Sequence, residues 1–155
     1  MITTPEIVSS PEQTVAYIHL LIPGQEIATA LPAALNELRD TLHDQQIAIT
    51  GPWYSWHLRC PRETFDVRIT MPIARAVQPT GRVEAGTREA ATVLRTTYTG
   101  NYTSLPGAWG EFHDWIDKNS SHQKLRADLW EVYLVCPDTS PSPTDWLTEM
   151  NRPIA

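Results

Sequence analysis

A carboxylate and a phenol alternate on one strand-like segment near the end of the chain, "LWEVYLV" (129–135). Because successive side chains of a strand point to opposite faces, Glu131 and Tyr133 share one face. Glutamate is depleted in strands, and taking its charge out of water is costly unless something compensates it. A bound organic cation would compensate the charge, and aromatic ring faces would attract the same cation. Glu131 is therefore the first candidate for a ligand contact.

The elements that position this pair belong to an internal repeat. Three pairs of segments resemble each other in the same order, two at an offset of 76 positions and one at 81. They are "VAYIHLLIPG" (15–24) with "ATVLRTTYTG" (91–100), "YSWHLRCP" (54–61) with "WEVYLVCP" (130–137), and "FDVRITMPIA" (65–74) with "WLTEMNRPIA" (146–155). Three matches in one order predict a duplication of the unit.

Each copy has the pattern strand–helix–strand–strand. The strands are expected at about 14–22, 53–60 and 64–71, and again at about 91–99, 129–135 and 146–152. Apolar residues at helical spacing mark the two helices: Ile27, Leu31, Leu35, Leu38 and Leu42 in the first copy, and Leu105, Trp109, Phe112 and Ile116 in the second. Pro32 predicts that the first helix kinks or begins there.

One copy alone would expose the apolar face of its sheet, so we expect one α+β domain over residues 1–155. Repeat one covers about 14–74, the polar stretch 75–90 is a connector, and repeat two covers about 91–155. The tandem strand–helix–strand–strand duplication predicts pseudo-two-fold symmetry. It also predicts an antiparallel sheet with helices on one face and a central ligand cleft on the other.

Alternation along the strands predicts which residues line this cleft. Trp130, Val132 and Leu134 form the more apolar set and should face the helices, which leaves Glu131 and Tyr133 on the open face. Their counterparts in the first copy are Ser55 and His57, and Tyr17 and His19 alternate away from an apolar set in the first strand. Trp56 and Trp130 are expected under the helices. Three further aromatic residues are candidates for the cleft wall: Trp53, Tyr102 and Trp146.

In its segments and their order, the chain resembles the GyrI-like family, the effector-binding domain of AraC-type and multidrug-responsive bacterial regulators. The resembling segments are "GPWYSWHL" (51–58), "TFDVRITMPI" (64–73), "VLRTTYTGNYTSLPGAWGEFHDWI" (93–116), "LWEVYLV" (129–135) and "WLTEMNRPI" (146–154). The resemblance implies the same duplicated fold and a pocket for lipophilic, often cationic, small molecules with a glutamate at its floor. By its place in the matching strand, that glutamate is Glu131.

The chain departs from the family pattern at two places. Gly100, Asn101 and Tyr102 stand where the family commonly has Gly-Pro-Tyr, and Arg68 stands where it often has an acid. A helix-turn-helix such as family regulators carry is not expected within this length, so the resemblance is to a stand-alone form. An ion pair of Glu131 with Arg68 or Arg95 is the structural alternative to a ligand contact.

Three functions fit these residues. The leading one is binding of lipophilic, cationic aromatic compounds for sensing or sequestration, with no cofactor. The second follows from the resemblance: some GyrI-like proteins hydrolyse cyclopropane-containing genotoxins, and Glu131 with Tyr133 would activate water. The third is an interaction role like that of the gyrase inhibitor. A hydrolytic triad of Ser55, His57 and Glu131 is disfavoured because no turn exposes the serine.

Composition excludes several other classes. The net charge of −6 and the lack of a Lys/Arg cluster argue against a nucleic-acid partner. No run approaches the roughly 20 apolar residues of a membrane span, and the N-terminus lacks the pattern of a signal peptide. Two cysteines without a disulfide framework fit a cytoplasmic protein. The five histidines show no spacing typical of a metal site.

Overall fold

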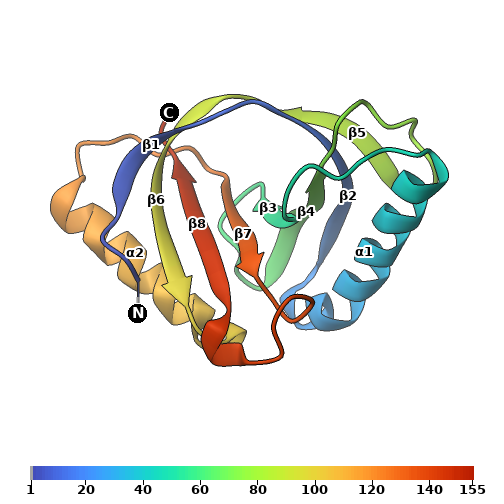
Figure 1. Ribbon diagram of the computed structural model, residues 1–155. Helices are drawn as coiled ribbons and strands as arrows, with labels where there is room; N and C mark the ends of the chain where they lie inside the picture. The colour runs from blue at the N-terminus through green and yellow to red at the C-terminus, as the bar shows by residue number, and fades with distance from the viewer. Residues whose placement is uncertain (1) are drawn as a thin grey trace. The chain divides into compact units, whose positions relative to one another are not determined.

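The computed structural model describes residues 2–155, which divide into two compact units. Unit 2 is the continuous segment Pro11–Ala90, and unit 1 is Ala91–Ala155 together with the N-terminal segment that ends at Ser10. Helix α1 belongs to unit 2 and helix α2 to unit 1 (Figure 1). No helix of residues 2–155 is long and apolar enough to span a membrane.

Unit 2 is a four-stranded antiparallel sheet with a helix on one face. Its strands β2 (Gln13–Pro23), β3 (Tyr54–His57), β4 (Thr64–Pro72) and β5 (Val83–Arg88) lie in the order β3-β4-β2-β5. Helix α1 (Ile27–Asp44) follows the short 3₁₀ turn η1 (Gly24–Glu26). Buried Leu38 of α1 and Ile18 and Ile69 of the sheet share one hydrophobic core.

Unit 1 repeats this plan, except that its fourth strand comes from the N-terminal segment. Its strands β1 (Glu6–Ser10), β6 (Ala91–Thr99), β7 (Leu129–Val135) and β8 (Leu147–Pro153) lie in the order β1-β6-β8-β7. The 3₁₀ turns η2 (Tyr102–Ser104) and η3 (Pro143–Asp145) precede α2 (Leu105–Asn119) and β8. Phe112 of α2 is fully buried against Leu94 and Met150 of the sheet.

These two units confirm the predicted α+β class, the tandem strand–helix–strand–strand plan and the antiparallel pairing. Two details differ. The stretch 75–90 is not only a connector, because β5 within it pairs with β2. Within its sequence "VEAGTR" only Val83 and Arg88 are buried, and they lie on opposite faces, so no apolar alternation marks the strand. Helix α1 begins at Ile27 and continues through Pro32 rather than beginning there.

The facing of the strands corrects the sequence prediction in both units. Glu131 lies directly across from Met150, which belongs to the core under α2. Glu131 and Tyr133 therefore lie on the helix-covered face, and Trp130, Val132 and Leu134 lie on the other. In unit 2, Ser55 pairs with Ile69 of the core, so Ser55 and His57 face α1 and Trp56 does not. The sequence prediction differs because it rests on hydropathy alone, which places the more apolar face of each strand against the helix.

Candidate ligand-binding site

Glu131 accepts two hydrogen bonds from neutral aromatic donors. The indole Nε1 of Trp109 on α2 lies 2.6 Å from one carboxylate oxygen, and the hydroxyl of Tyr133 lies 2.7 Å from the other. The residue is only 8% exposed. Hydrogen bonds to a carboxylate offset part of the cost of burying it, and they hold both oxygens in place. Helix α2 and strand β7 thus fix the orientation of the carboxylate together.

No cation of the described residues pairs with this carboxylate, so the predicted ion-pair alternative is wrong. Arg95 instead donates from Nε to Asn151 Oδ1 at 2.7 Å and lies 3.4 Å from Glu149. Arg68 lies over two aromatic rings in unit 2. Glu131 is therefore a nearly buried acid whose hydrogen bonds come from neutral groups.

Two further aromatic residues stand beside this pair. The ring of Tyr102 meets that of Tyr133 edge to face, with centroids 5.8 Å apart, and it stacks on Trp146 at 4.8 Å. Trp146 is anchored by a hydrogen bond from its Nε1 to the carbonyl of Ser140 at 3.0 Å. We call Glu131, Tyr133, Trp109, Tyr102 and Trp146 the Glu131 cluster; all five belong to unit 1.

The loop before α2 places Tyr102. Gly100 has φ +144°, and a Cβ there would lie 2.6 Å from the hydroxyl of Tyr98, so only glycine fits. That hydroxyl donates to the carbonyl of Asn101 at 2.8 Å, and the Asn101 side chain accepts from the backbone N–H of Ser104 at 3.1 Å. Asparagine thus caps η2 where the related pattern has proline.

The surroundings of Tyr102 raise the pKa of its phenol. Its burial raises the pKa of the phenol to about 12, and electrostatic interactions with Cys136, Glu131 and Asp138 act in the same direction. The hydroxyl makes no hydrogen bond within residues 2–155, and the ring is only partly buried. Tyr102 is therefore held by ring contacts alone, which makes it the least anchored aromatic of the cluster.

Sequence reasoning missed two members of this neighbourhood. Trp109 serves in the sequence only to mark the apolar face of the second helix, although an indole N–H that leaves water needs an acceptor, and that need pointed toward an acid. Thr148, directly across from Tyr133, is fully buried and its hydroxyl has no hydrogen-bond partner within residues 2–155. No spacing signal distinguished Thr148 from an ordinary strand residue.

The predicted cleft residues of unit 2 do not share one face. Ser55 and His57 are buried on the face toward α1, where His57 meets Phe65 edge to face at 5.5 Å. Trp53 packs against the same core. Tyr17 and His19 lie on the opposite face, as predicted, because their neighbours Ile18 and Leu20 fill the core. Of the nine predicted site residues, unit 1 therefore brings together Glu131, Tyr133, Tyr102 and Trp146.

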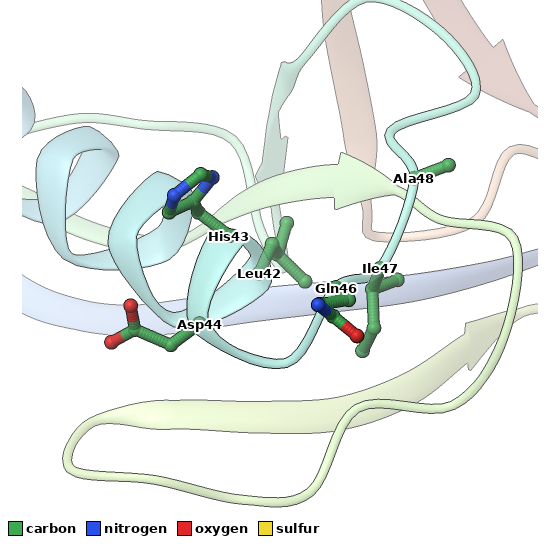
Figure 2. A pocket seen from close by; sticks show the side chains of 6 residues that line it. All are labelled: Leu42, His43, Asp44, Gln46, Ile47 and Ala48. Carbon is green, nitrogen blue, oxygen red and sulfur yellow. The ribbon is translucent and has the colours of Figure 1, made fainter.

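Two depressions on the surface contain no residue of the Glu131 cluster. One, of about 560 Å³, lies at the end of α1 and is shown in Figure 2; it is lined by Leu42, His43, Asp44, Gln46, Ile47 and Ala48. The other, of about 700 Å³, runs between the N-terminal residues 2–5 and α2, beside Trp115. Neither contains a predicted site residue.

Comparison with known proteins gives a family and a fold. The model of the GyrI-like small molecule binding domain matches residues 3–155. No curated protein sequence matches the chain. The crystal structure of the EcmrR C-terminal domain has a TM-score of 0.86 at 16% identity, covering 98% of this chain and 97% of that one.

Three other solved structures show the same fold. EcmrR in complex with DNA gives a TM-score of 0.81 at 19% identity over 97% of this chain, which spans only 57% of the EcmrR chain. SAV2435 bound to tetraphenylphosphonium gives 0.67 at 12% identity, over 99% of this chain and 94% of that one. A hydrolase from Listeria innocua gives 0.64 at 12% identity, over 97% and 91%.

Proposed function

Since this chain belongs to the family of GyrI-like small-molecule-binding domains, we propose that it binds lipophilic aromatic cations at the Glu131 cluster. One observation carries the proposal. Glu131 is nearly buried, yet within residues 2–155 it has neutral hydrogen-bond donors and no cation. A ligand that brings a positive charge would complete the site electrostatically.

The aromatic residues supply the rest of the affinity. Faces of tyrosine and tryptophan attract organic cations by roughly 0.5–2 kcal/mol per contact, and more where water is excluded. Flat rings also accept ligands of different shapes, which suits a site of broad specificity. The ligand class is lipophilic because the cluster offers one charge and a large apolar area.

Tyr102 is the residue that must move to admit a ligand. Glu131 is only 8% exposed, and Tyr102 touches both Tyr133 and Trp146. Ring stacking is worth about 0.5–1.5 kcal/mol per pair, so displacing Tyr102 costs little compared with the gain from a charged contact. We expect the ring of Tyr102 to swing aside and then to pack on the bound cation.

A pair of probes with the same shape and opposite charge tests the proposal. Tetraphenylphosphonium, the compound in the SAV2435 structure, should bind saturably, and tetraphenylborate should bind much more weakly. Glu131→Gln should weaken tetraphenylphosphonium by about 1–3 kcal/mol, roughly 5- to 150-fold, because it removes a charge-assisted contact. Isothermal titration calorimetry measures both.

The control variants separate a ligand role from a structural one. In Glu131→Gln the amide oxygen can accept from Trp109 while the amide N–H donates to the Tyr133 oxygen, so the free energy of unfolding should change by less than about 1 kcal/mol. Glu111→Gln removes the same charge from the exposed face of α2 and should leave binding unchanged. Equal binding of the two probes, or unchanged affinity in Glu131→Gln, would contradict the proposal.

Hydrolysis of a strained cyclopropane is the second candidate, because the hydroxyl of Tyr133 lies 2.7 Å from Glu131. In this reaction Glu131 takes a proton from water, the water oxygen bonds to one ring carbon, a carbon–carbon bond breaks, and Tyr133 protonates the leaving carbon; the proton on Glu131 then passes to the Tyr133 oxygen, which restores both groups. Mass analysis of a recovered cyclopropane compound decides: a gain of one water supports hydrolysis, and an unchanged mass supports binding alone.

A further inference from the structure

A second charged group surrounded by aromatic residues lies on the sheet of unit 2, on the face opposite α1. Arg68 of β4 lies between β3 and β2, and its guanidinium carbon is 4.5 Å from the ring centre of Tyr17 and 5.0 Å from that of Trp56. Because β3 and β2 flank β4, the two rings lie on opposite sides of the guanidinium. We call Tyr17, Trp56 and Arg68 the Arg68 stack.

Arg68 has no acidic partner among residues 2–155. The nearest acid on its own strand and face, Asp66, lies 2.5 Å from His19 Nε2 and 3.1 Å from Arg59. The hydrogen bond from His19 is the main reason that the pKa of Asp66 is lowered. Glu84, across from Tyr17 on β5, is exposed and makes no ion pair with Arg68. The guanidinium donates no hydrogen bond to the described residues.

The geometry of the stack holds this guanidinium in one plane. Gly86 of β5 leaves room for the ring of Tyr17, because a Cβ on residue 86 would lie 2.8 Å from Tyr17 Cε1. Arg68 Nε is shielded from solvent, whereas the residue as a whole is partly exposed. The edge of the guanidinium that faces solvent is therefore the one with the two terminal nitrogens. Such an edge matches a carboxylate, which accepts two parallel hydrogen bonds.

We propose that the Arg68 stack binds a planar carboxylate, with the terminal nitrogens of Arg68 donating to both of its oxygens. The rings of Tyr17 and Trp56 extend the slot on either side, so an aryl carboxylate lies coplanar with the guanidinium and gains contact with both. A tetrahedral phosphate can take the same two hydrogen bonds but not this flat packing. This inference is independent of the proposed cation site, which belongs to unit 1.

Benzoate is the probe, with benzamide as its neutral isostere and inorganic phosphate as the tetrahedral oxyanion. The ¹⁵N–¹H signals of the arginine side chains should shift saturably with benzoate, more weakly with phosphate, and not with benzamide. Arg68→Lys keeps the charge but loses the two parallel N–H donors of the guanidinium, so benzoate affinity should fall about tenfold. Tyr17→Leu removes one wall of the slot and should weaken benzoate but not phosphate.

The matched control is Arg62→Gln, which removes an equal charge from an exposed position of the same unit. It should change benzoate affinity by less than about twofold, because exposed charges are well screened. An equal loss in Arg62→Gln, equal shifts with phosphate and benzoate, or no saturable shift with benzoate overturns the proposal. Tetraphenylphosphonium binding should be unchanged in Arg68→Lys, so a failure of either site is seen separately.

Discussion

In unit 1 aromatic residues surround a negative charge, and in unit 2 they surround a positive one. Trp109 and Tyr133 present their N–H and O–H groups to the carboxylate of Glu131. Tyr17 and Trp56 present their ring faces to the guanidinium of Arg68. An aromatic ring has a negative face and a positive edge, so the same residue types stabilise opposite charges in different orientations. The two units thus share one fold, while their aromatic residues surround opposite charges.

The two sites also differ in the elements that form them. The Glu131 cluster depends on its helix, because Trp109 reaches the carboxylate from α2. The Arg68 stack lies on the face away from α1 and is built by strands alone. Three variants test this contrast.

Trp109→Phe should have the largest effect. The ring is kept, but one oxygen of the nearly buried carboxylate loses its only donor. Leaving a buried charged acceptor unsatisfied costs about 2–3 kcal/mol of unfolding free energy. Urea denaturation measures the loss. Trp146→Phe is the control, because its indole donates to a neutral carbonyl, and it should cost only about 1 kcal/mol. Equal losses would mean that the charge of Glu131 does not matter to stability.

Gly86→Ala should have a smaller effect, confined to the Arg68 stack. The added methyl would lie 2.8 Å from the ring of Tyr17 and must push it aside, at a cost of about 1 kcal/mol. The affinity for benzoate should fall with it. Gly110→Ala meets open space on α2 and should stabilise the protein by about 0.5–1 kcal/mol, because alanine is the better helix former. Thermal unfolding that ranks these two variants in the opposite order would refute the close packing.

The smallest effect is a change in one phenol. Burial, with the nearby negative charges, raises the pKa of Tyr102 from 10.0 to about 12, and burial raises that of Tyr54 to about 12 against the lowering effect of Arg88. Glu131→Gln should lower the pKa of Tyr102 only, as ultraviolet titration with Tyr102→Phe and Tyr54→Phe as references would show. A parallel change at Tyr54 would point to a global loosening.

These phenols also predict how stability changes at alkaline pH. The unfolded chain ionises a tyrosine near pH 10.0, while the folded protein keeps Tyr102 neutral to about 12. The contribution of Tyr102 to stability is therefore complete below pH 10.0 and is lost as pH rises toward 12. Unfolding curves of the parent protein and of Tyr102→Phe should diverge only in that window.

The repeat predicted the fold because both copies keep the same apolar spacing. It did not predict which face of β7 lies toward the helix, because Trp130 and Val132 make the opposite face the more apolar one. Besides the hydroxyl of Tyr133, the indole of Trp109, 22 positions away in sequence, makes the helix-covered face acceptable to Glu131. The site was thus predictable as a group of residue types, whereas the partner of its carboxylate required the three-dimensional structure.

The discontinuity of unit 1 has a consequence for the order of assembly. Strand β1 pairs only with β6 among the strands of unit 1, and Ile7 lies across from Leu94, 87 positions later (94 − 7). During synthesis β1 leaves the ribosome long before its partner, while unit 2 is contiguous and emerges complete by Ala90. Until β6 is made, the backbone of β1 and the side chain of Ile7 have no strand of their own unit to pair with. The nascent chain therefore carries an unpaired N-terminal strand, which can pair with other strands, until β6 (Ala91–Thr99) is made.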